Sequence, residues 1–204
     1  MANGEYGIPD GYKPTVEEVK EYLKRWKEDE NANSKELALN KLFHELCPDN
    51  NNIADVLIKC STLNDFYSTN IFDVYSIAQH IVKMNIDNRL RIGDPELVKD
   101  IAEVKVGKSK TKRTFYSFAT KYCSHHQEEL YPIYDSYVER VLWEFKKRGD
   151  DYSSFKREDL KEYEKYKKVI DDFRNHYGLK EFTYKEIDQY LWQIGKLFFA
   201  KDKE

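Results

Sequence analysis

Apolar residues recur every three or four positions along most of the chain, the spacing that places them on one face of an α-helix. The first such segment follows Thr15, which begins a Thr-x-x-Glu capping box of the kind that satisfies backbone amides at a helix start. A second helix is expected to begin at Ser34 and to end before Pro48. Two more are expected over residues 53–67 and 71–84, and the last should be the most buried helix of the chain.

The same periodicity continues through the second half. Asp94 has the position of an N-cap, a further helix is expected over residues 112–126, and Asp135 is placed to cap the next one. Two long amphipathic helices follow over residues 158–177 and 184–200, and the second begins behind a Thr-x-x-Glu capping box at Thr183. The sequence therefore predicts an all-α protein with eight to nine helices. Their number and unequal lengths favour an irregular globular array over a four-helix bundle.

The ends of the pattern suggest how the chain is organised. Residues 1–13 contain three of the eight glycines and little apolar periodicity, so they are expected to be an N-terminal tail or an arm laid on the surface. No linker or internal repeat interrupts residues 14–204, which are expected to form a single all-α domain.

Composition adds limits on the class of protein. Hydrophobic residues make up 40 % of the 204 positions, enough to build a core, and the net charge of −3 excludes a uniformly basic surface. The sequence has no apolar run long enough for a membrane span and no signal-like N-terminus. Its three cysteines are an odd number and form no Cys-x-x-Cys pair. We therefore expect a cytoplasmic protein without a membrane partner.

The charges are unevenly distributed along the chain. Residues 104–127 contain six Lys and Arg residues and no Asp or Glu, which gives this stretch a charge of +6 and the rest of the chain −9. Such a polarity suits a protein that contacts a polyanion through one patch.

Several kinds of chemistry are disfavoured. The sequence has no Gly-rich phosphate loop, no His-Glu-x-x-His motif and no Ser/His/Asp order typical of hydrolases. Cys123, His125 and His126 lie close together and, with His44 or His80, could in principle hold a metal. Their spacing is not one used by zinc sites, and adjacent histidines on a helix point about 100° apart. Neither a metal nor a cofactor is expected.

Two neighbouring segments carry the most specific pattern. Residues 112–123 end in Ala-Thr-Lys-Tyr-Cys, and residues 131–138 read Tyr-Pro-Ile-Tyr-Asp-Ser-Tyr-Val. Together they resemble the active-site segment of helix-hairpin-helix DNA glycosylases, in particular 8-oxoguanine DNA glycosylase-like proteins, over about residues 112–142. The resemblance implies that family's two-lobed helical fold, with Lys121 as the nucleophile and Asp135 as the catalytic aspartate. One departure is that residues 115–120 lack the glycines of the family's hairpin, so this hairpin is altered or lost.

The resemblance implies a base-excision glycosylase that acts as a monomer on double-stranded DNA containing an oxidised purine such as 8-oxoguanine. Breaking the base–sugar bond builds positive charge on the sugar, which a fixed carboxylate such as that of Asp135 stabilises. A neutral Lys121 amine that attacks C1′ forms a Schiff base and gives abasic-site lyase activity. Both residues also have a purely structural interpretation. Asp135 is suited to be an ordinary N-cap, and Lys121 is suited to be a solvated lysine on an amphipathic helix, as most lysines are.

The remaining candidates concern DNA contacts. If the domain divides into two lobes, residues 70–148 should form the DNA-facing one. Candidate contacts to the DNA backbone are Lys108, Lys110, Lys112, Arg113, His125 and His126. The aromatic residues chosen to stack on a flipped base are Trp192 and Phe198, from a group that includes Trp143 and Phe199. The alternative function is a non-catalytic all-α protein that retains the scaffold and binds DNA or a protein.

Overall fold

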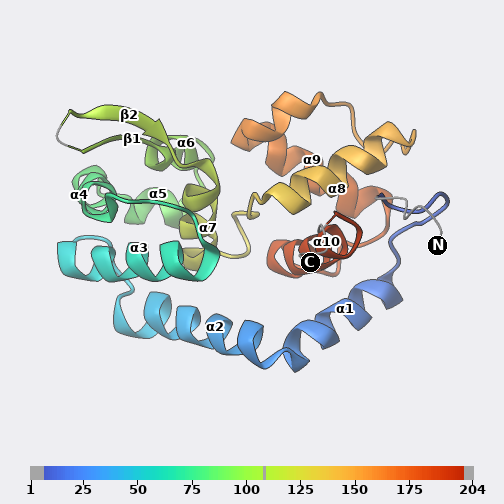
Figure 1. Cartoon of the computed structure of the whole chain (residues 1–204), viewed down its shortest axis with the longest axis horizontal. Helices are drawn as coiled ribbons and strands as arrows, with labels where there is room; N and C mark the ends of the chain where they lie inside the picture. Colours follow the sequence, from blue (N-terminus) through green and yellow to red (C-terminus); the bar gives the residue numbers. More distant parts are fainter. Residues whose placement is uncertain (1–6, 108, 200–204) are drawn as a thin grey trace, which may run out of the picture. The chain divides into compact units, whose positions relative to one another are not determined.

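The computed structural model describes residues 7–107 and 109–199, which form ten α-helices, one β-hairpin and two short helical segments of other types (Figure 1). The all-α class is confirmed. The sequence predicted eight to nine helices because α5 (Asp87–Ile92) was missed. Its six residues are too few to show a helical period. Within the described residues, none of the helices has both the length and the apolar composition needed to cross a bilayer.

The chain divides into two compact units. Unit 1 comprises Met1–Glu28 and Tyr134–Glu204, and unit 2 comprises Asp29–Ile133. The lobe expected over residues 70–148 is divided here, with residues 70–133 in unit 2 and residues 134–148 in unit 1. Each unit has its own hydrophobic core.

Unit 1 contains α1 (Val16–Glu28), α8 (Ser136–Lys147), α9 (Tyr163–His176) and α10 (Tyr184–Phe199), and α10 packs against α1 and α8. Both predicted caps are present. The Glu18 backbone N–H donates to Thr15 Oγ1 at 3.2 Å. At the start of α10, Thr183 and Glu186 each donate a backbone N–H to the other's side chain.

One expectation for unit 1 needs correction. The helix expected over residues 158–177 is interrupted, because a 3-10 segment (Arg157–Lys161) is followed by Glu162 in an extended conformation before α9 begins. The described part of the expected tail or arm, residues 7–13, lies against the unit: Ile8 is buried and the Tyr12 hydroxyl donates to Glu18. The apolar and hydroxyl groups of this short segment provide these contacts without any periodicity.

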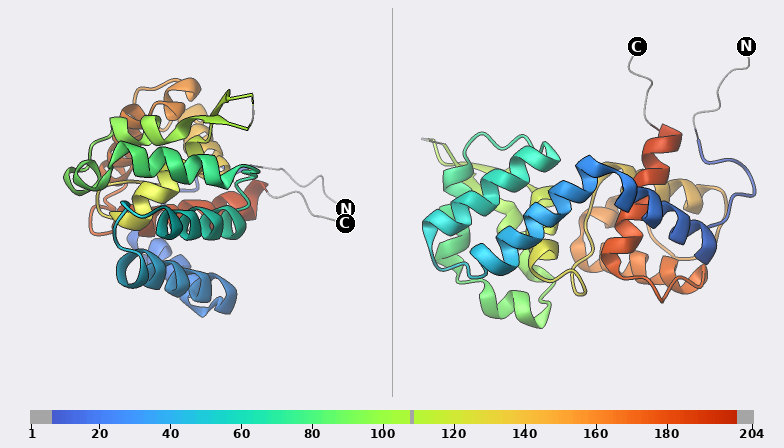
Figure 2. Two further views of the ribbon diagram at one scale, coloured as in Figure 1. Left: turned by 90° about the vertical axis from the view of Figure 1, so that its left-hand side faces the viewer. Right: turned by 90° about the horizontal axis from the view of Figure 1, so that it is seen from below.

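Unit 2 contains α2 (Glu30–Asn40), a π-helical segment (Lys41–Leu46), α3 (Ile53–Tyr67), α4 (Val74–Met84), α5, α6 (Glu96–Ala102) and α7 (Tyr116–His126). α3 has the predicted bounds and packs against α4 and α7, while α6 packs against α7 (Figures 1 and 2).

The predicted starts of two helices in unit 2 were wrong. α2 begins earlier than Ser34, because the Asp29 carboxylate accepts the Ala32 backbone N–H at 3.0 Å and caps the helix. α4 begins at Val74, behind the cap formed by Asp73. α4 is also not the most buried helix, since the Tyr75 side chain is 53 % exposed. α7 is more buried, with every residue from Phe118 to His126 inside.

A β-hairpin precedes α7 where the sequence predicted only helix. Its strands β1 (Glu103–Val106) and β2 (Thr111–Thr114) are antiparallel, and α7 therefore begins at Tyr116 rather than at Lys112. All four residues of β2 are exposed. A strand without a buried face has no apolar alternation to reveal it in the sequence.

Candidate site on α7

Lys121 is buried in the middle of α7, with 3 % of its surface exposed. Its Nζ donates a hydrogen bond to Ser117 Oγ, one turn earlier on the same helix, at 2.6 Å. The amine also lies 5.1 Å from the centre of the Tyr67 ring, at the end of α3. Lysine is among the residues least often buried, so this position needs a structural or functional reason.

His125 lies one turn after Lys121 and contacts the same tyrosine. The Tyr67 hydroxyl and His125 Nε2 are 2.9 Å apart, within hydrogen-bond distance. The four residues Ser117, Lys121, His125 and Tyr67 are termed the Lys121 cluster. It combines an amine, a hydroxyl, a phenol and an imidazole, which are groups that can attack, donate or accept protons in catalysis.

A second buried lysine, which sequence reasoning missed, lies on α3 and contacts α7. Lys59 of α3 is fully buried, and its Nζ donates to the Asp49 backbone oxygen at 2.9 Å and to Asn50 Oδ1 at 2.7 Å. His126 Nε2 lies 3.2 Å from the same amine. Burial lowers the pKa of Lys59 to about 8. Its spacing of three residues from Val56 and four from Leu63, both apolar, was the sequence signal for this position.

Asn50 links Lys59 to α5 and α7. Its side-chain amide donates to Asp87 Oδ1 at 2.5 Å, and its Oδ1 also accepts the Tyr122 hydroxyl. The residues Asn50, Lys59, Tyr122 and His126 are termed the Lys59 cluster. Burial lowers the pKa of His126 well below its usual value, so the ring is neutral. Its Nε2 lies 3.2 Å from both Lys59 Nζ and Asn50 Oδ1, and the tautomer decides which of the two it bonds. We conclude that the Lys59 cluster braces α7.

The two histidines are poorly placed for the expected contacts with DNA phosphates. His125 and His126 are both buried, and each has hydrogen-bond partners within unit 2. Side chains that bind phosphates are normally presented at the surface. Both rings lie inside unit 2 because α7 is buried from Phe118 to His126.

Asp135 caps α8, as the sequence predicted. Its Oδ1 accepts the backbone N–H of Tyr137 at 2.9 Å. The negative charge of the carboxylate is favourable at this position because a helix N-terminus carries a partial positive charge. Lys121 belongs to unit 2 and Asp135 to unit 1, and the structure describes each within its own unit.

The predicted cationic residues lie on the β-hairpin. Lys110 and Arg113 are exposed, and Lys112 forms an ion pair of 2.6 Å with Glu103 on the neighbouring strand. Lys108 lies outside the described residues. The hairpin therefore occupies the chain segment before α7 and presents positive charge to solvent.

The aromatic residues expected to stack on a base lie on α10 in unit 1 and take part in its packing. Trp192 is in edge-to-face contact with Trp26, and Phe198 with Tyr12, both at 5.6 Å between ring centres. Among the described residues, no group of three or more His, Cys, Asp or Glu side chains could hold a metal ion. The three cysteines are buried and form no disulfide.

A family match covers most of α1 and of unit 2. The family model HI_0787_N, described as an N-terminal domain, matches residues 18–130, which is more than half of the chain. The chain belongs to this family. A relative from Haemophilus influenzae described as an uncharacterized protein is 49 % identical over 152 residues, covering 74 % of this chain and 71 % of the relative. No solved structure matches the chain.

The HI_0787_N match includes both buried lysine clusters and the hairpin, and it ends before Asp135. The part of the chain that defines the family is thus also the part that buries Lys59 and Lys121.

Proposed function

We propose that this protein is a base-excision DNA glycosylase with abasic-site lyase activity, in which Lys121 is the nucleophile and the substrate is an oxidised purine such as 8-oxoguanine in duplex DNA. The observation that carries the proposal is the position of the Lys121 amine, which is held away from bulk water beside a hydroxyl and an aromatic ring. Removal from water is one of the means by which enzymes prepare a lysine for attack on carbon.

The reaction follows from the chemistry of the amine. The nitrogen lone pair forms a bond to C1′ while the C1′–base bond breaks, and the base leaves with that electron pair and takes up a proton. The nitrogen then loses a proton, and its lone pair expels the ring oxygen O4′, which is protonated. This gives a Schiff base between Lys121 and C1′, from which the 3′ phosphate can be eliminated.

Asp135 is the second residue of the proposed mechanism, and its role rests on the resemblance. A carboxylate stabilises the positive charge that develops on the sugar as the base departs. The hydrogen bond from the Tyr137 backbone restricts the orientation of this side chain, so little reorganisation is needed during the reaction.

The hairpin supplies the proposed contacts with the DNA backbone. Lys110, Lys112 and Arg113 lie in one exposed segment, and each phosphate neutralised by such a side chain releases counterions. These contacts would hold the duplex while the damaged nucleotide is turned out of the stack.

The experiment is a nicking assay on a labelled duplex with a single 8-oxoguanine. The wild-type protein should release the base and cut the strand, Lys121→Gln should not cut, and Asp135→Asn should be slower by about 10²-fold or more. Salt-dependent DNA binding with no product from the wild type would instead support the non-catalytic alternative, which the exposed cationic hairpin also fits.

A further inference from the structure

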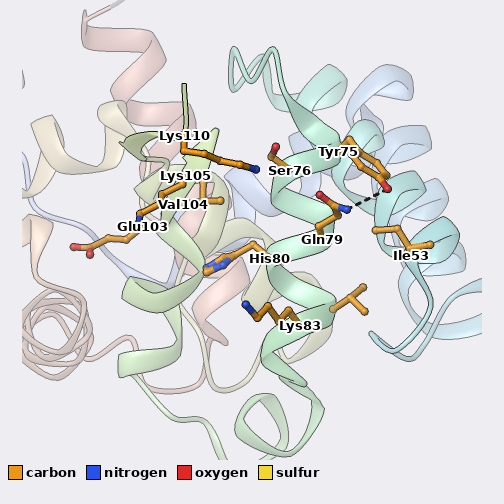
Figure 3. A pocket seen from close by; sticks show the side chains of 11 residues that line it. Ile53, Tyr75, Ser76, Gln79, His80, Lys83, Glu103, Val104, Lys105 and Lys110 are labelled. Carbon is orange, nitrogen blue, oxygen red and sulfur yellow. Dashed lines mark hydrogen bonds between the residues drawn. The ribbon is translucent and has the colours of Figure 1, made fainter. Parts of the chain in front are cut away.

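A groove on unit 2 lies between α4 and β1 (Figure 3), and Lys121 is not among its lining residues. Its volume is about 770 Å³. Side chains from both sides line it: Tyr75, Gln79, His80, Lys83, Lys105 and Lys110. Of these six residues, the sequence pointed to Lys110 as a DNA contact and to His80 as a conceivable metal ligand.

The groove is positively charged. Lys83 extends from α4, whereas Lys105 and Lys110 come from the hairpin, so cations line both walls (Figure 3). Glu103 is the one carboxylate among the described lining residues, and it is paired with Lys112 at 2.6 Å. An anionic ligand would therefore meet three lysine ammonium groups and one already compensated carboxylate.

The same groove has an exposed aromatic and apolar wall. The ring of Tyr75 is about half exposed, and its hydroxyl accepts a hydrogen bond from Gln79 Nε2 at 3.2 Å, which restrains the ring on α4. Ile53 of α3 and Val82 of α4 add apolar surface, and Val104 of β1 lines the hairpin side. Phe72, three residues before Tyr75, is 100 % exposed. Aromatic rings interleaved with lysines along a groove are typical of surfaces that bind single-stranded nucleic acid.

One wall of the groove is tied to the other by Asp73. The Asp73 carboxylate caps α4 through Ser76 and also accepts the Gly107 backbone N–H at the hairpin turn, at 2.7 Å. These hydrogen bonds lower the pKa of Asp73, so the link is intact at neutral pH. The groove is therefore formed before any ligand binds.

We propose that this groove binds a short run of single-stranded DNA, with its phosphates at Lys83, Lys105 and Lys110 and an unpaired base stacked on Tyr75. A duplex is a poorer fit, because its bases are stacked on one another and leave the aromatic wall without a partner. The choice of DNA over RNA rests on the proposed function, whereas the groove chemistry itself is common to both.

The test measures fluorescence anisotropy of labelled oligonucleotides of about twelve nucleotides with the full-length protein. The ligands are single-stranded oligo-dT, a duplex of the same length and single-stranded oligo-U. The groove variant K83A/K105A/K110A is compared with the control variant K41A/R91A/K99A, which removes the same charge from exposed positions of unit 2 outside the groove. Circular dichroism verifies that each variant is folded.

We expect the groove variant to bind oligo-dT at least about 10-fold more weakly, with a reduced salt slope, and the control variant to change by less than about 2-fold. Tyr75→Ala should weaken binding by about 5-fold or more without changing the salt slope. If the groove variant and the control variant lose the same amount of affinity for oligo-dT, the groove is not the binding site. Duplex binding as tight as oligo-dT binding would overturn the single-strand assignment, and tighter binding of oligo-U would overturn the choice of DNA.

This experiment is independent of the nicking assay. If oligo-dT binding depends on the groove and the protein cuts at no lesion, the groove proposal is supported and the glycosylase activity is contradicted. If cutting depends on Lys121 and the groove variant binds oligo-dT as well as the wild type, the glycosylase activity is supported and the groove proposal is contradicted.

Discussion

The two buried lysines differ in what surrounds their amines. Lys59 donates to a backbone carbonyl and a side-chain amide and contacts a neutral histidine, an arrangement that satisfies a structural lysine. Lys121 has a serine hydroxyl and the face of Tyr67 beside its amine. Lys59 therefore contributes to the stability of unit 2, whereas the chemical role of Lys121 is part of the proposed function and rests on the burial of its amine and on the resemblance.

Lys59 should make the stability of the protein depend on pH. Because its pKa falls from 10.5 to about 8 on folding, the unfolded chain binds more protons than the folded chain between these values. The free energy of unfolding should accordingly rise with pH in this window, by about 2 kcal/mol from Lys59 alone between about pH 8 and pH 10. Urea unfolding of the wild type and of Lys59→Met across that range measures the difference.

The Lys59→Met protein should lack this rise, while Lys41→Met, at an exposed position, should retain it. Comparison with these variants cancels the ionisation of tyrosines, which begins at the upper end of the range. Parallel profiles for the wild type and Lys59→Met would show that Lys59 keeps an ordinary pKa in the folded protein.

Sequence reasoning at the residue scale succeeded where a residue belongs to a local motif. Thr15, Thr183 and Asp135 were placed correctly as caps because each cap depends on the next few residues only. Lys59 was missed because its partners Asn50 and His126 come from other segments of the chain. Whether a lysine is buried is decided by tertiary contacts that one segment does not contain.

At the scale of elements, the link between α4 and the hairpin depends on Asp73. Asp73→Ala should lose both the cap of α4 and the bond to Gly107, at a cost of about 1 to 2 kcal/mol in the free energy of unfolding. Hydrogen exchange followed by mass spectrometry should show faster exchange in residues 103–114. The control is Asp29→Ala, which removes the cap of α2 alone. Unchanged exchange of the hairpin in Asp73→Ala would contradict the proposed anchoring.

The contact between α8 and α10 depends on the absence of a side chain at Gly195. A Cβ atom at this position would lie 2.7 Å from Tyr137 Cβ and 3.1 Å from the Tyr137 carbonyl oxygen. Gly195→Ala should therefore lower the free energy of unfolding by about 1 to 3 kcal/mol. Gly7→Ala, where nothing lies within 4 Å, should change it by less than about 0.5 kcal/mol. Equal stability of the two variants in urea unfolding would show that the helices shift apart without cost.

Helices with a strong apolar face were predictable, and elements without one were not. α3 was located correctly because its apolar residues and its end signals agree. The hairpin was missed because β2 has no buried residue, and the burial of α7 was underestimated because it includes polar residues such as Thr120 and Ser124. Thr120 is tolerated inside because its hydroxyl donates to the Ser117 carbonyl at 2.9 Å.

At the scale of the whole molecule, the charge polarity seen in the sequence corresponds to two different environments. Most of the cations of residues 104–127 lie on the exposed hairpin, whereas Lys121 from the same stretch is buried in α7. One segment of the chain thus supplies both the surface charge for a proposed DNA contact and the amine for the proposed reaction. The net charge of −3 alone reveals neither.

The central claim is that Lys121 attacks C1′ of a damaged nucleotide, and reductive trapping tests it most directly. Borohydride delivers a hydride to the Schiff base and converts it into a stable amine that joins protein and DNA. With a duplex containing 8-oxoguanine, the wild type and Lys41→Gln should give a covalent adduct, and Lys121→Gln should give none. Peptide mapping should locate the adduct at Lys121. No adduct from the wild type on any oxidised purine, or an undiminished adduct from Lys121→Gln, would contradict the claim.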